Sequence, residues 1–239
     1  EHTSRGLGDV YKRQVDSIRL LGIIDQKKKY PNLKVLVSLG GWGGCKTCSD
    51  VFNSKQGRID FAKSTAKIIK DYNADGIDLD WEYPAIPGPP GHAFRDEDRD
   101  NFTDLIKLLR EYMQPNDILS FAAGGFKSFI DKSVDWDKVT PLIDNVNLMT
   151  YDLIGGYSKA TGHHTSLYST KNQERSGDYA IKYLKSKGLE FVTERGNQKT
   201  KINWWILGGS LIFVIFTLSV GSFNVPFAQE IVFIGSVAI

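Results

Sequence analysis

Apolar residues change their spacing in a regular way through the middle of the chain. Residues 33–39 form a short run rich in leucine and valine that ends at two glycines, which predicts a buried strand followed by a turn. In residues 61–72, apolar side chains recur every three or four positions, the spacing that gathers them on one face of a helix. The pattern therefore predicts a strand and a helix that covers it.

The same pairing of a strand with a helix recurs downstream. Strict alternation over 76–83 predicts a second strand, and after a loop rich in Pro and Gly the residues 102–112 have helical spacing. Two more strands, at 119–123 and 146–151, and a helix at 179–187 continue the series. Repeated units of this kind imply parallel strands, in either an open doubly wound sheet or a closed barrel.

The composition of the 239-residue chain agrees with a globular α/β protein. Hydrophobic residues make up 41% and charged residues 24%, so a packed core is expected rather than disorder. The formal net charge of +2 gives no reason to expect a nucleic-acid partner. Cys45 and Cys48 are too few for a disulfide framework, and either a local disulfide in an exported protein or two free thiols fits them.

The two ends of the chain differ from its middle. Residues 1–14 are excluded from the fold argument, because 9–14 resemble the translation of a sequencing adaptor or form an ordinary polar arm. No charged residue occurs over 202–229, and the segment 204–223 is long enough for a transmembrane helix. A buried strand and a chimeric join are the alternatives. Residues 189–239 are therefore treated as a separate tail.

Three carboxylates at alternate positions carry the candidate chemistry. In a strand, Asp78, Asp80 and Glu82 share one face at steps of about 6.5 Å, while Trp81 points to the other face. Because parallel strands are usually covered on both faces, these acids are expected inside the fold, where burial and mutual repulsion raise a carboxyl pKa. A carboxyl group that keeps its proton near neutral pH can act as a general acid. An exposed edge strand with solvated acids is the alternative.

Neither a metal nor a cofactor is expected. Acids at alternate positions also occur in calcium-binding loops, but the required Gly and Glu are missing whether the loop is counted from Asp78 or from Asp96. Cys45 and Cys48 have no suitably placed pair of histidines with which to bind zinc. The acidic run 96–100 is interpreted as a solvated approach to the following helix, whose positive end favours acids.

Three motifs together resemble glycoside hydrolase family 18, the chitinases and related endo-N-acetylglucosaminidases. Residues 75–84, DGIDLDWEYP, match its DxxDxDxE signature, and residues 38–41, SLGG, and 149–152, MTYD, are similar to its SxGG and MxYD strand ends. The resemblance covers 15–188. It implies a partial TIM barrel, with about four to six of the eight β-α units and truncation at both ends, and an active site at the C-terminal ends of the strands.

The resemblance also implies a role for each motif residue. Glu82 would protonate the glycosidic oxygen and later act as a base toward water, while Asp80 would hold the acetamido N–H of the substrate and Asp78 would share charge or a proton with Asp80. The sugar's own N-acetyl oxygen would attack and form an oxazolinium intermediate, which gives retention. Tyr151 would hydrogen-bond the acetamido oxygen.

Further residues are expected to bind the substrate or support the acids. Trp42 would stack on a pyranose ring, or would instead pack beneath its loop. The other substrate-binding candidates are Gly41, Tyr83, Met149 and Asp152, and the supporting candidates are Asp75, expected to support Asp78, and Ser38.

The implied activity is hydrolysis of β-1,4-linked N-acetylglucosamine polymers, chitin or chitooligosaccharides. The full-length parent is expected to be a secreted monomer, with membrane association through 204–223 as a further possibility for this chain. A lectin-like chitin-binding protein is one alternative, although such relatives lack the acid found here at Glu82. An inactive fragment of a chitinase is the other.

Overall fold

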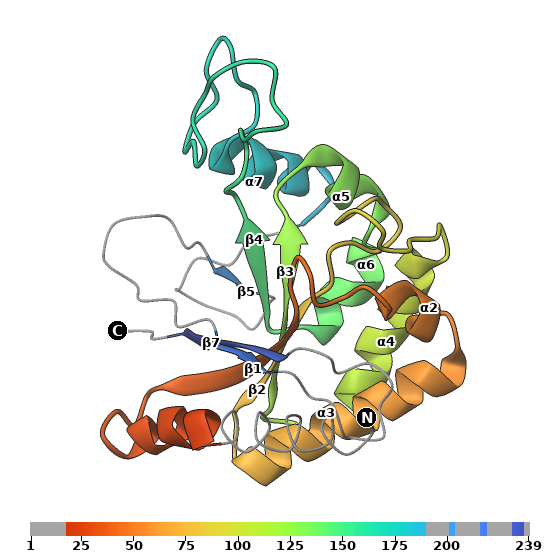
Figure 1. The fold of residues 1–239 in the computed structure, drawn as a ribbon, viewed down its shortest axis with the longest axis vertical. Helices are drawn as coiled ribbons and strands as arrows, with labels where there is room; N and C mark the ends of the chain where they lie inside the picture. The colour runs from red at the N-terminus through yellow and green to blue at the C-terminus, as the bar shows by residue number, and fades with distance from the viewer. Residues whose placement is uncertain (1–17, 190–200, 204–215, 219–230, 237–239) are drawn as a thin grey trace, which may run out of the picture.

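The computed structural model describes residues 18–189 and the strand segments 201–203, 216–218 and 231–236. Its strands form one sheet in the order β5-β4-β3-β2-β1-β7-β6 (Figure 1). Neighbouring strands from β1 to β5 are parallel, whereas β7 is antiparallel to both β1 and β6. The strands are β1 (Lys34–Gly40), β2 (Gly76–Asp80), β3 (Ile118–Gly124), β4 (Asn145–Met149), β5 (Lys201–Asn203), β6 (Phe216–Leu218) and β7 (Ile231–Ser236).

Helices connect the parallel strands and cover the sheet. The long helices α3 and α4 pack against each other beside it, and α7 follows the long loop after β4 (Figure 1). The expected fold class and the expected strand and helix positions are confirmed, with shifted bounds; α2, α5 and α6 were not expected. The helices are α2 (Cys48–Phe52), α3 (Lys55–Tyr72), α4 (Asp98–Tyr112), α5 (Lys127–Lys132), α6 (Trp136–Val139) and α7 (Gly177–Ser186), with 3-10 turns η1 (Gln26–Lys28) and η2 (Thr140–Leu142).

Capping residues fix where α3 begins and ends, and so where β2 starts. The Ser54 hydroxyl accepts a hydrogen bond from the backbone N–H of Gly57 at 2.9 Å, which satisfies one free donor of the first turn. At the other end Asn73 takes a left-handed conformation with φ of 54°, and the Ala74 N–H bonds to the Ile69 carbonyl at 3.0 Å. The chain therefore reverses within three residues and enters β2.

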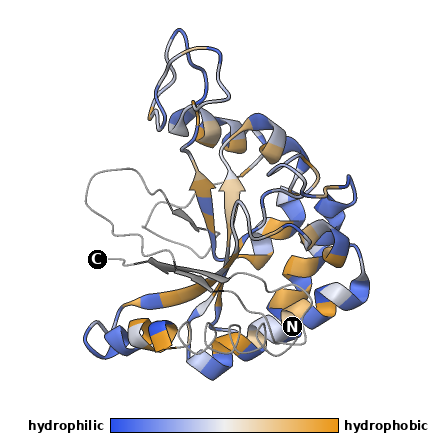
Figure 2. Ribbon diagram, viewed as in Figure 1, coloured by the Kyte–Doolittle hydropathy of each residue, from blue (hydrophilic) through white to orange (hydrophobic). Residues whose placement is uncertain are grey.

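A row of aromatic rings fills the space between the sheet and its helices. Trp81 is 5% exposed and lies between Phe52 and Phe102, with ring centroids 5.1 and 6.3 Å away. Phe121 continues the row from Phe102 to Trp136, at 5.2 and 5.9 Å. Apolar colouring accordingly gathers on the strands and the neighbouring sides of α3 and α4 (Figure 2). Trp81, directly after β2, thus packs among the rings beside the helices, whereas Asp78 on β2 bonds to side chains of the neighbouring strands.

Strand β2 is shorter than the alternating pattern suggests. It ends at Asp80, so Glu82 lies in the turn that follows and not on the strand itself. The Asp80 carbonyl accepts the Gly41 N–H at 2.8 Å, and the peptide bond between Glu82 and Tyr83 is cis. Because the backbone turns here, Glu82 is placed by the loop rather than by strand alternation.

The apolar tail is described only in part. Of the candidate membrane segment 204–223, residues 216–218 are described, and they form β6. This fits the alternative of a strand, which the uncharged composition of the run also favours. Among the described residues, none of the helices combines the length and the apolar character that a membrane crossing requires. The excluded segment 1–14 lies outside the described residues.

Gly76 permits the close approach of β2 to β3. A Cβ atom at this position would lie 1.9 Å from the carbonyl oxygen of Ile118. We therefore expect Gly76→Ala to lower the free energy of unfolding by about 1–3 kcal/mol, because the strands must separate to admit the methyl group. Chemical denaturation measures the change.

Gly22 provides the matched control. It lies in helical residues 18–25, and a Cβ atom there would meet nothing within 4 Å. Gly22→Ala is expected to leave stability unchanged or to raise it by up to about 1 kcal/mol. Equal stability of the two variants would contradict the assigned role of Gly76.

Candidate active site

Asp78 on β2 is the buried centre of a hydrogen-bond network that reaches β1, β3 and β4. Its side chain is 1% exposed, and it accepts hydrogen bonds from Ser120 at 2.5 Å, Asn147 at 2.7 Å and Ser38 at 3.3 Å. Burial raises the pKa of the Asp78 carboxyl, while these three donors partly offset the rise. The expected support by Ser38 is present, and the donors hold the carboxylate in one orientation.

Asp80 lies next along β2 and has far less hydrogen-bond support. Its Oδ1 atom is buried and has no hydrogen-bond partner among the described residues. Burial raises the pKa of the Asp80 carboxyl well above its usual value, and the negative charges of Glu82 and Asp78 raise it further. A proton on Asp80 removes the charge that the surroundings do not compensate, so this residue is suited to hold a proton or to meet a polar group of a ligand.

Glu82 has the environment of a general acid. It is 8% exposed, and burial is the main factor that raises the pKa of its carboxyl. A hydrogen bond from the Tyr83 side chain opposes this rise, and the charge of Asp152 adds to it. Of the two expected causes, burial and repulsion by the strand acids, burial is the larger for the Glu82 pKa, and the neighbouring charge that raises this pKa belongs to Asp152 instead of a strand acid.

Two tyrosines flank the acids in different ways. Tyr151 is half-exposed, and burial of its hydroxyl raises its pKa, with Asp80, Glu82, Asp152 and Asp78 adding to the effect. Tyr151 therefore lies near the acids, as the sequence suggested, and part of its side chain stays accessible to a ligand. Tyr83 was expected to bind substrate, but its hydroxyl bonds to Glu82 and its ring packs edge-on against Phe126 and Phe129.

Glycines after β1 bring the Trp42 loop against the end of β2. A Cβ atom at Gly40, where φ is 119°, would lie 2.1 Å from the Asp80 carbonyl oxygen, and Gly41 donates to that same oxygen. Trp42 is 56% exposed, and its ring lies edge-on to Tyr83 at 6.3 Å. Packing beneath the loop is thus excluded for Trp42, and its ring is free to stack on a ligand.

Met149 and Asp152, at the end of β4 and just after it, differ in exposure and contacts. Met149 is half-buried, and its carbonyl accepts the Gly125 N–H at 3.2 Å. Asp152, like Met149 a candidate for substrate binding, has a side chain that is 74% exposed and contacts the His164 imidazole. Its backbone is left-handed, with φ of 52°, a conformation that a non-glycine residue rarely adopts.

Asp75 does not support Asp78 directly. Its carboxylate pairs with Lys27 at 2.8 Å and Lys34 at 3.3 Å and accepts the Val35 N–H at 2.8 Å, all at the opposite end of the strands. The five residue steps from Asp75 to Asp80 span roughly 16 Å in a strand. The signature Asp75 therefore fastens β1 to β2, and it lies away from the acids.

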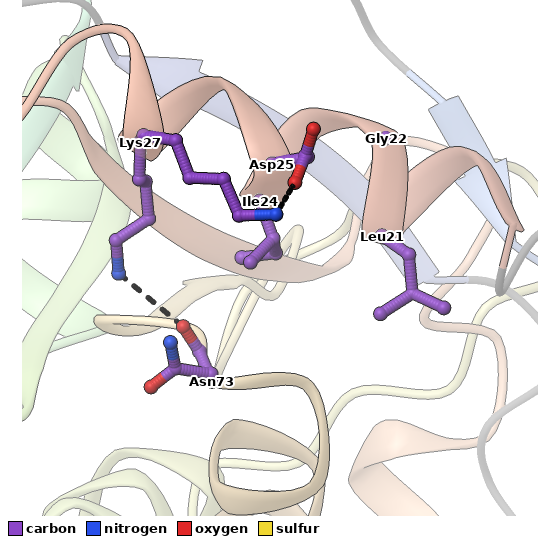
Figure 3. Close-up of a pocket in the computed structure, with 7 residues that line it drawn as sticks. Leu21, Gly22, Ile24, Asp25, Lys27 and Asn73 are labelled. Atoms are coloured by element: carbon purple, nitrogen blue, oxygen red, sulfur yellow. Dashed lines mark hydrogen bonds and ion pairs between the residues drawn. The ribbon is translucent and has the colours of Figure 1, made fainter.

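A hollow of about 700 Å³ lies near this far end. Figure 3 shows Lys27 reaching toward Asn73, whose carbonyl it contacts at 3.3 Å, with Leu21 and Ile24 on the helical side. None of the strand acids lines it. We assign this hollow no part in the chemistry of the acids.

The acidic run before α4 is not simply solvated, as its composition suggested. Asp98 is fully buried and accepts hydrogen bonds from the Ser49 hydroxyl at 2.9 Å and the Arg95 N–H at 2.8 Å. It joins the loop after β2 to α2, next to the disulfide between Cys45 and Cys48. Of the two alternatives for the cysteines, the structure has the local disulfide. The disulfide and the hydrogen bonds of Asp98 together hold the loops around the acids.

Several residues of the site had no assigned role in the sequence analysis. Ser120 and Asn147 bond to Asp78 because strand alternation and register place them on the same face of the sheet. A polar residue at an inward position of a predicted strand was the available signal. His164 could not be found in this way, since loop geometry alone brings it to Asp152.

Comparison with known proteins assigns the chain to a family. The model of "Glycosyl hydrolases family 18" matches residues 8–206. Chitinase A1 of Niallia circulans is 34% identical over 148 residues, which are 59% of this chain and 21% of that protein.

Solved structures agree with this match. Chitinase ChiW from Paenibacillus sp. str. FPU-7 is 42% identical with a TM-score of 0.67, over 73% of this chain and 21% of that one. A mutant of catalytic domain 2 of the Ostrinia furnacalis Group II chitinase, in complex with penta-N-acetylchitooctaose, is 26% identical with a TM-score of 0.63, over 75% of this chain and 52% of that one. The chain thus spans 21% to 52% of the length of these relatives. The parallel strands β1 to β5 and their helices are part of a TIM barrel, and the chain belongs to glycosyl hydrolase family 18.

Proposed function

We propose that the protein to which this chain belongs hydrolyses β-1,4-linked N-acetylglucosamine polymers, with Glu82 as the general acid and base. The observation that carries the proposal is the burial of Glu82, whose charge acts on the half-exposed Tyr151 and whose hydrogen-bond partner Tyr83 contacts the exposed Trp42 ring. A buried carboxyl group with a raised pKa delivers a proton to a leaving oxygen at a pH where a free glutamate has lost it.

The other strand acids suit a substrate that supplies its own nucleophile. Asp80 has a buried oxygen that no described residue of the chain hydrogen-bonds, and an acetamido N–H of the substrate would satisfy it. Asp78 is fixed by three donors and adds negative charge near the positive oxazolinium that forms when the acetamido oxygen attacks the anomeric carbon. Tyr151 then hydrogen-bonds the acetamido oxygen, and Glu82 takes the proton from the attacking water.

Trp42 and the named relatives indicate the substrate class. Trp42 offers an exposed aromatic face for the C–H surface of a pyranose ring, and the relatives named chitinases extend the same expectation to chitin and its oligosaccharides. The parent enzyme is proposed to be secreted, which suits the Cys45–Cys48 disulfide and an extracellular polymer. All the acids come from one chain, so a monomer suffices for the site.

Replacing Glu82 tests the role of the acid. Glu82→Gln is expected to lower kcat on chitooligosaccharides by about 10²–10⁴-fold while substrate binding persists, since the amide keeps the shape of the side chain but cannot donate and accept the proton. Release of reducing ends and calorimetric binding measure the two effects. Near-normal turnover would overturn the acid assignment.

The same assay includes a matched control and tests the lectin-like alternative. Glu111 is an exposed glutamate on α4, so Glu111→Gln should leave kcat unchanged. Chitin binding by the unmodified protein with no release of reducing ends would instead support the lectin-like alternative.

The proposed chemistry requires an N-acetyl group on the reacting sugar. Fully de-N-acetylated oligosaccharides should be hydrolysed at least about 10²-fold more slowly than the acetylated forms of equal length, because the amine cannot form the oxazolinium ring. Product analysis by NMR should show the β-anomer first. Equal rates on both substrates, or an initial α-anomer, would contradict substrate assistance.

A further inference from the structure

The loop between β2 and α4 folds back onto the backbone of Glu82. A Cβ atom at Gly88 would lie 2.2 Å from the carbonyl oxygen of Glu82, 2.8 Å from its carbonyl carbon and 3.0 Å from the backbone nitrogen of Tyr83. All three atoms belong to the peptide group that joins Glu82 to Tyr83. The bare backbone at Gly88 therefore rests against this peptide, in a place that a side chain could not share.

The peptide group that Gly88 contacts connects two parts of the site. On one side it is bonded to the Cα atom that carries the Glu82 carboxyl group. On the other side it leads to Tyr83, whose ring lies edge-on to Trp42 at 6.3 Å and to Phe126 at 5.5 Å. A shift of this peptide therefore moves the acid relative to the rings around it.

A second glycine contact lies two residues earlier in the same turn. The Asp80 carbonyl accepts the Gly41 N–H at 2.8 Å, and a Cβ atom at Gly40 would lie 2.1 Å from that carbonyl oxygen. The carbonyl groups of Asp80 and Glu82 thus each face a glycine of another segment. The turn that carries the acid is enclosed by backbone on both sides.

The loop that carries Gly88 is stiff. Pro87 and Pro89 flank the glycine, and their rings fix the backbone dihedral φ. Ile86 is 5% exposed and belongs to the hydrophobic core, and the His92 N–H donates to the Pro89 carbonyl at 3.1 Å. The loop is therefore unable to withdraw easily from the Glu82 peptide.

Asp98 fastens the far end of the same loop to α2. It is fully buried at the start of α4, and its two oxygens have separate donors. Oδ1 accepts the Ser49 hydroxyl at 2.9 Å, and Oδ2 accepts the Arg95 N–H at 2.8 Å. Both ends of the loop are thus fixed, which keeps Gly88 against Glu82.

We propose that Gly88 is a positioning residue, whose bare backbone holds the Glu82 carbonyl and so keeps the acid in its reactive position. The inference rests on the proposed function for its catalytic meaning. It gives a role in the chemistry to the loop rich in Pro and Gly, which lies outside the acidic signature.

The size of the effect follows from the contact. Real Cβ atoms essentially never approach a neighbour within 3.0 Å, so a methyl group at Gly88 displaces the Glu82 peptide by roughly 1 Å. A misplacement of about 1 Å lowers a catalysed rate by about 10²-fold. Opening the turn also admits water, and because burial is the main factor that raises the pKa of Glu82, this pKa falls.

Gly88→Ala in the full-length protein to which this chain belongs is the direct test. We expect kcat on chitooligosaccharides to fall by about 10²-fold, while the calorimetric Kd changes by less than about threefold, since the substrate-binding side chains remain. Titration of the Glu82 carboxyl carbon by ¹³C NMR should show a midpoint lower by about 0.5 pH units. A purely structural role would move neither kcat nor this midpoint in the folded variant.

Gly91 provides a matched control in the same loop. It is exposed, with φ of 82°, and a Cβ atom there would meet no described atom within 4 Å. Asn tolerates this left-handed conformation, so Gly91→Asn should leave kcat and the Glu82 midpoint unchanged. Effects equal to those of Gly88→Ala would point to a general disturbance of the loop and overturn the inference.

A second variant loosens the loop at its far end and decides the matter if Gly88→Ala fails to fold. Asp98→Asn keeps the size of the side chain, but with one oxygen it cannot accept from both Ser49 and Arg95. We expect kcat to fall by about tenfold and the Glu82 midpoint to fall as well. An unmoved or raised midpoint, or a kcat within about threefold of the unmodified protein, would overturn the inference.

The titration does not depend on turnover, so the two proposals fail in different ways. Normal activity of Glu82→Gln removes the proposed function, while a lower Glu82 midpoint in Gly88→Ala still shows that the glycine places this side chain. Loss of activity in Glu82→Gln, together with an unmoved midpoint in Gly88→Ala, removes only the inference about Gly88.

Discussion

Withdrawal of carboxyl groups from water at the end of β2 is the constraint on which the site depends. Asp78, Asp80 and Glu82 come within five residues of one chain and meet the same low-polarity interior. Ionising all three carboxyl groups there is unfavourable, and each of them has a different local environment. Asp78 receives three hydrogen bonds, Asp80 has an oxygen without a partner in the part of the chain that the structure describes, and Glu82 lies in the turn with one tyrosine donor.

The rest of the described fold keeps this arrangement in place from both ends of the strands. The aromatic row behind the sheet holds Trp81 on the face opposite the acids, while Asp75 joins the first residues of β1 and β2 through two lysines. Around the acids, the glycines after β1 and the buried Asp98 fix two loops against β2 and α2. Burial of the acids is therefore a property of the whole sheet and its loops.

Sequence periodicity was sufficient to predict the helices and strands that bury a continuous apolar face. The strands near 33–39 and 119–123 and the helices α3, α4 and α7 follow from residue spacing, and the inward face of β2 follows from its alternation. The turn after Asp80 did not follow, because alternation continues in the sequence beyond the point where the backbone leaves the strand.

Residue spacing also could not predict the contacts between segments that are distant in the sequence. The position of Asp75 at the far end of the strands depends on two lysines elsewhere in the chain, and the burial of Asp98 depends on Ser49. Loop conformation brings His164 to Asp152. Family resemblance supplied the identity of the acids, whereas their electrostatic differences required the three-dimensional environment of each carboxyl group.

Infrared difference spectroscopy of the acids tests the central claim most directly. With ¹³C-labelled carboxyl groups, the carbonyl stretch of a protonated carboxylic acid is compared at about pH 6 between the unmodified protein and Asp80→Asn or Glu82→Gln, at a pH where free carboxylates are ionised. The account predicts a protonated band in the unmodified protein that decreases in at least one of these variants. Complete ionisation of the carboxyl groups at that pH, with no band to lose, would contradict it.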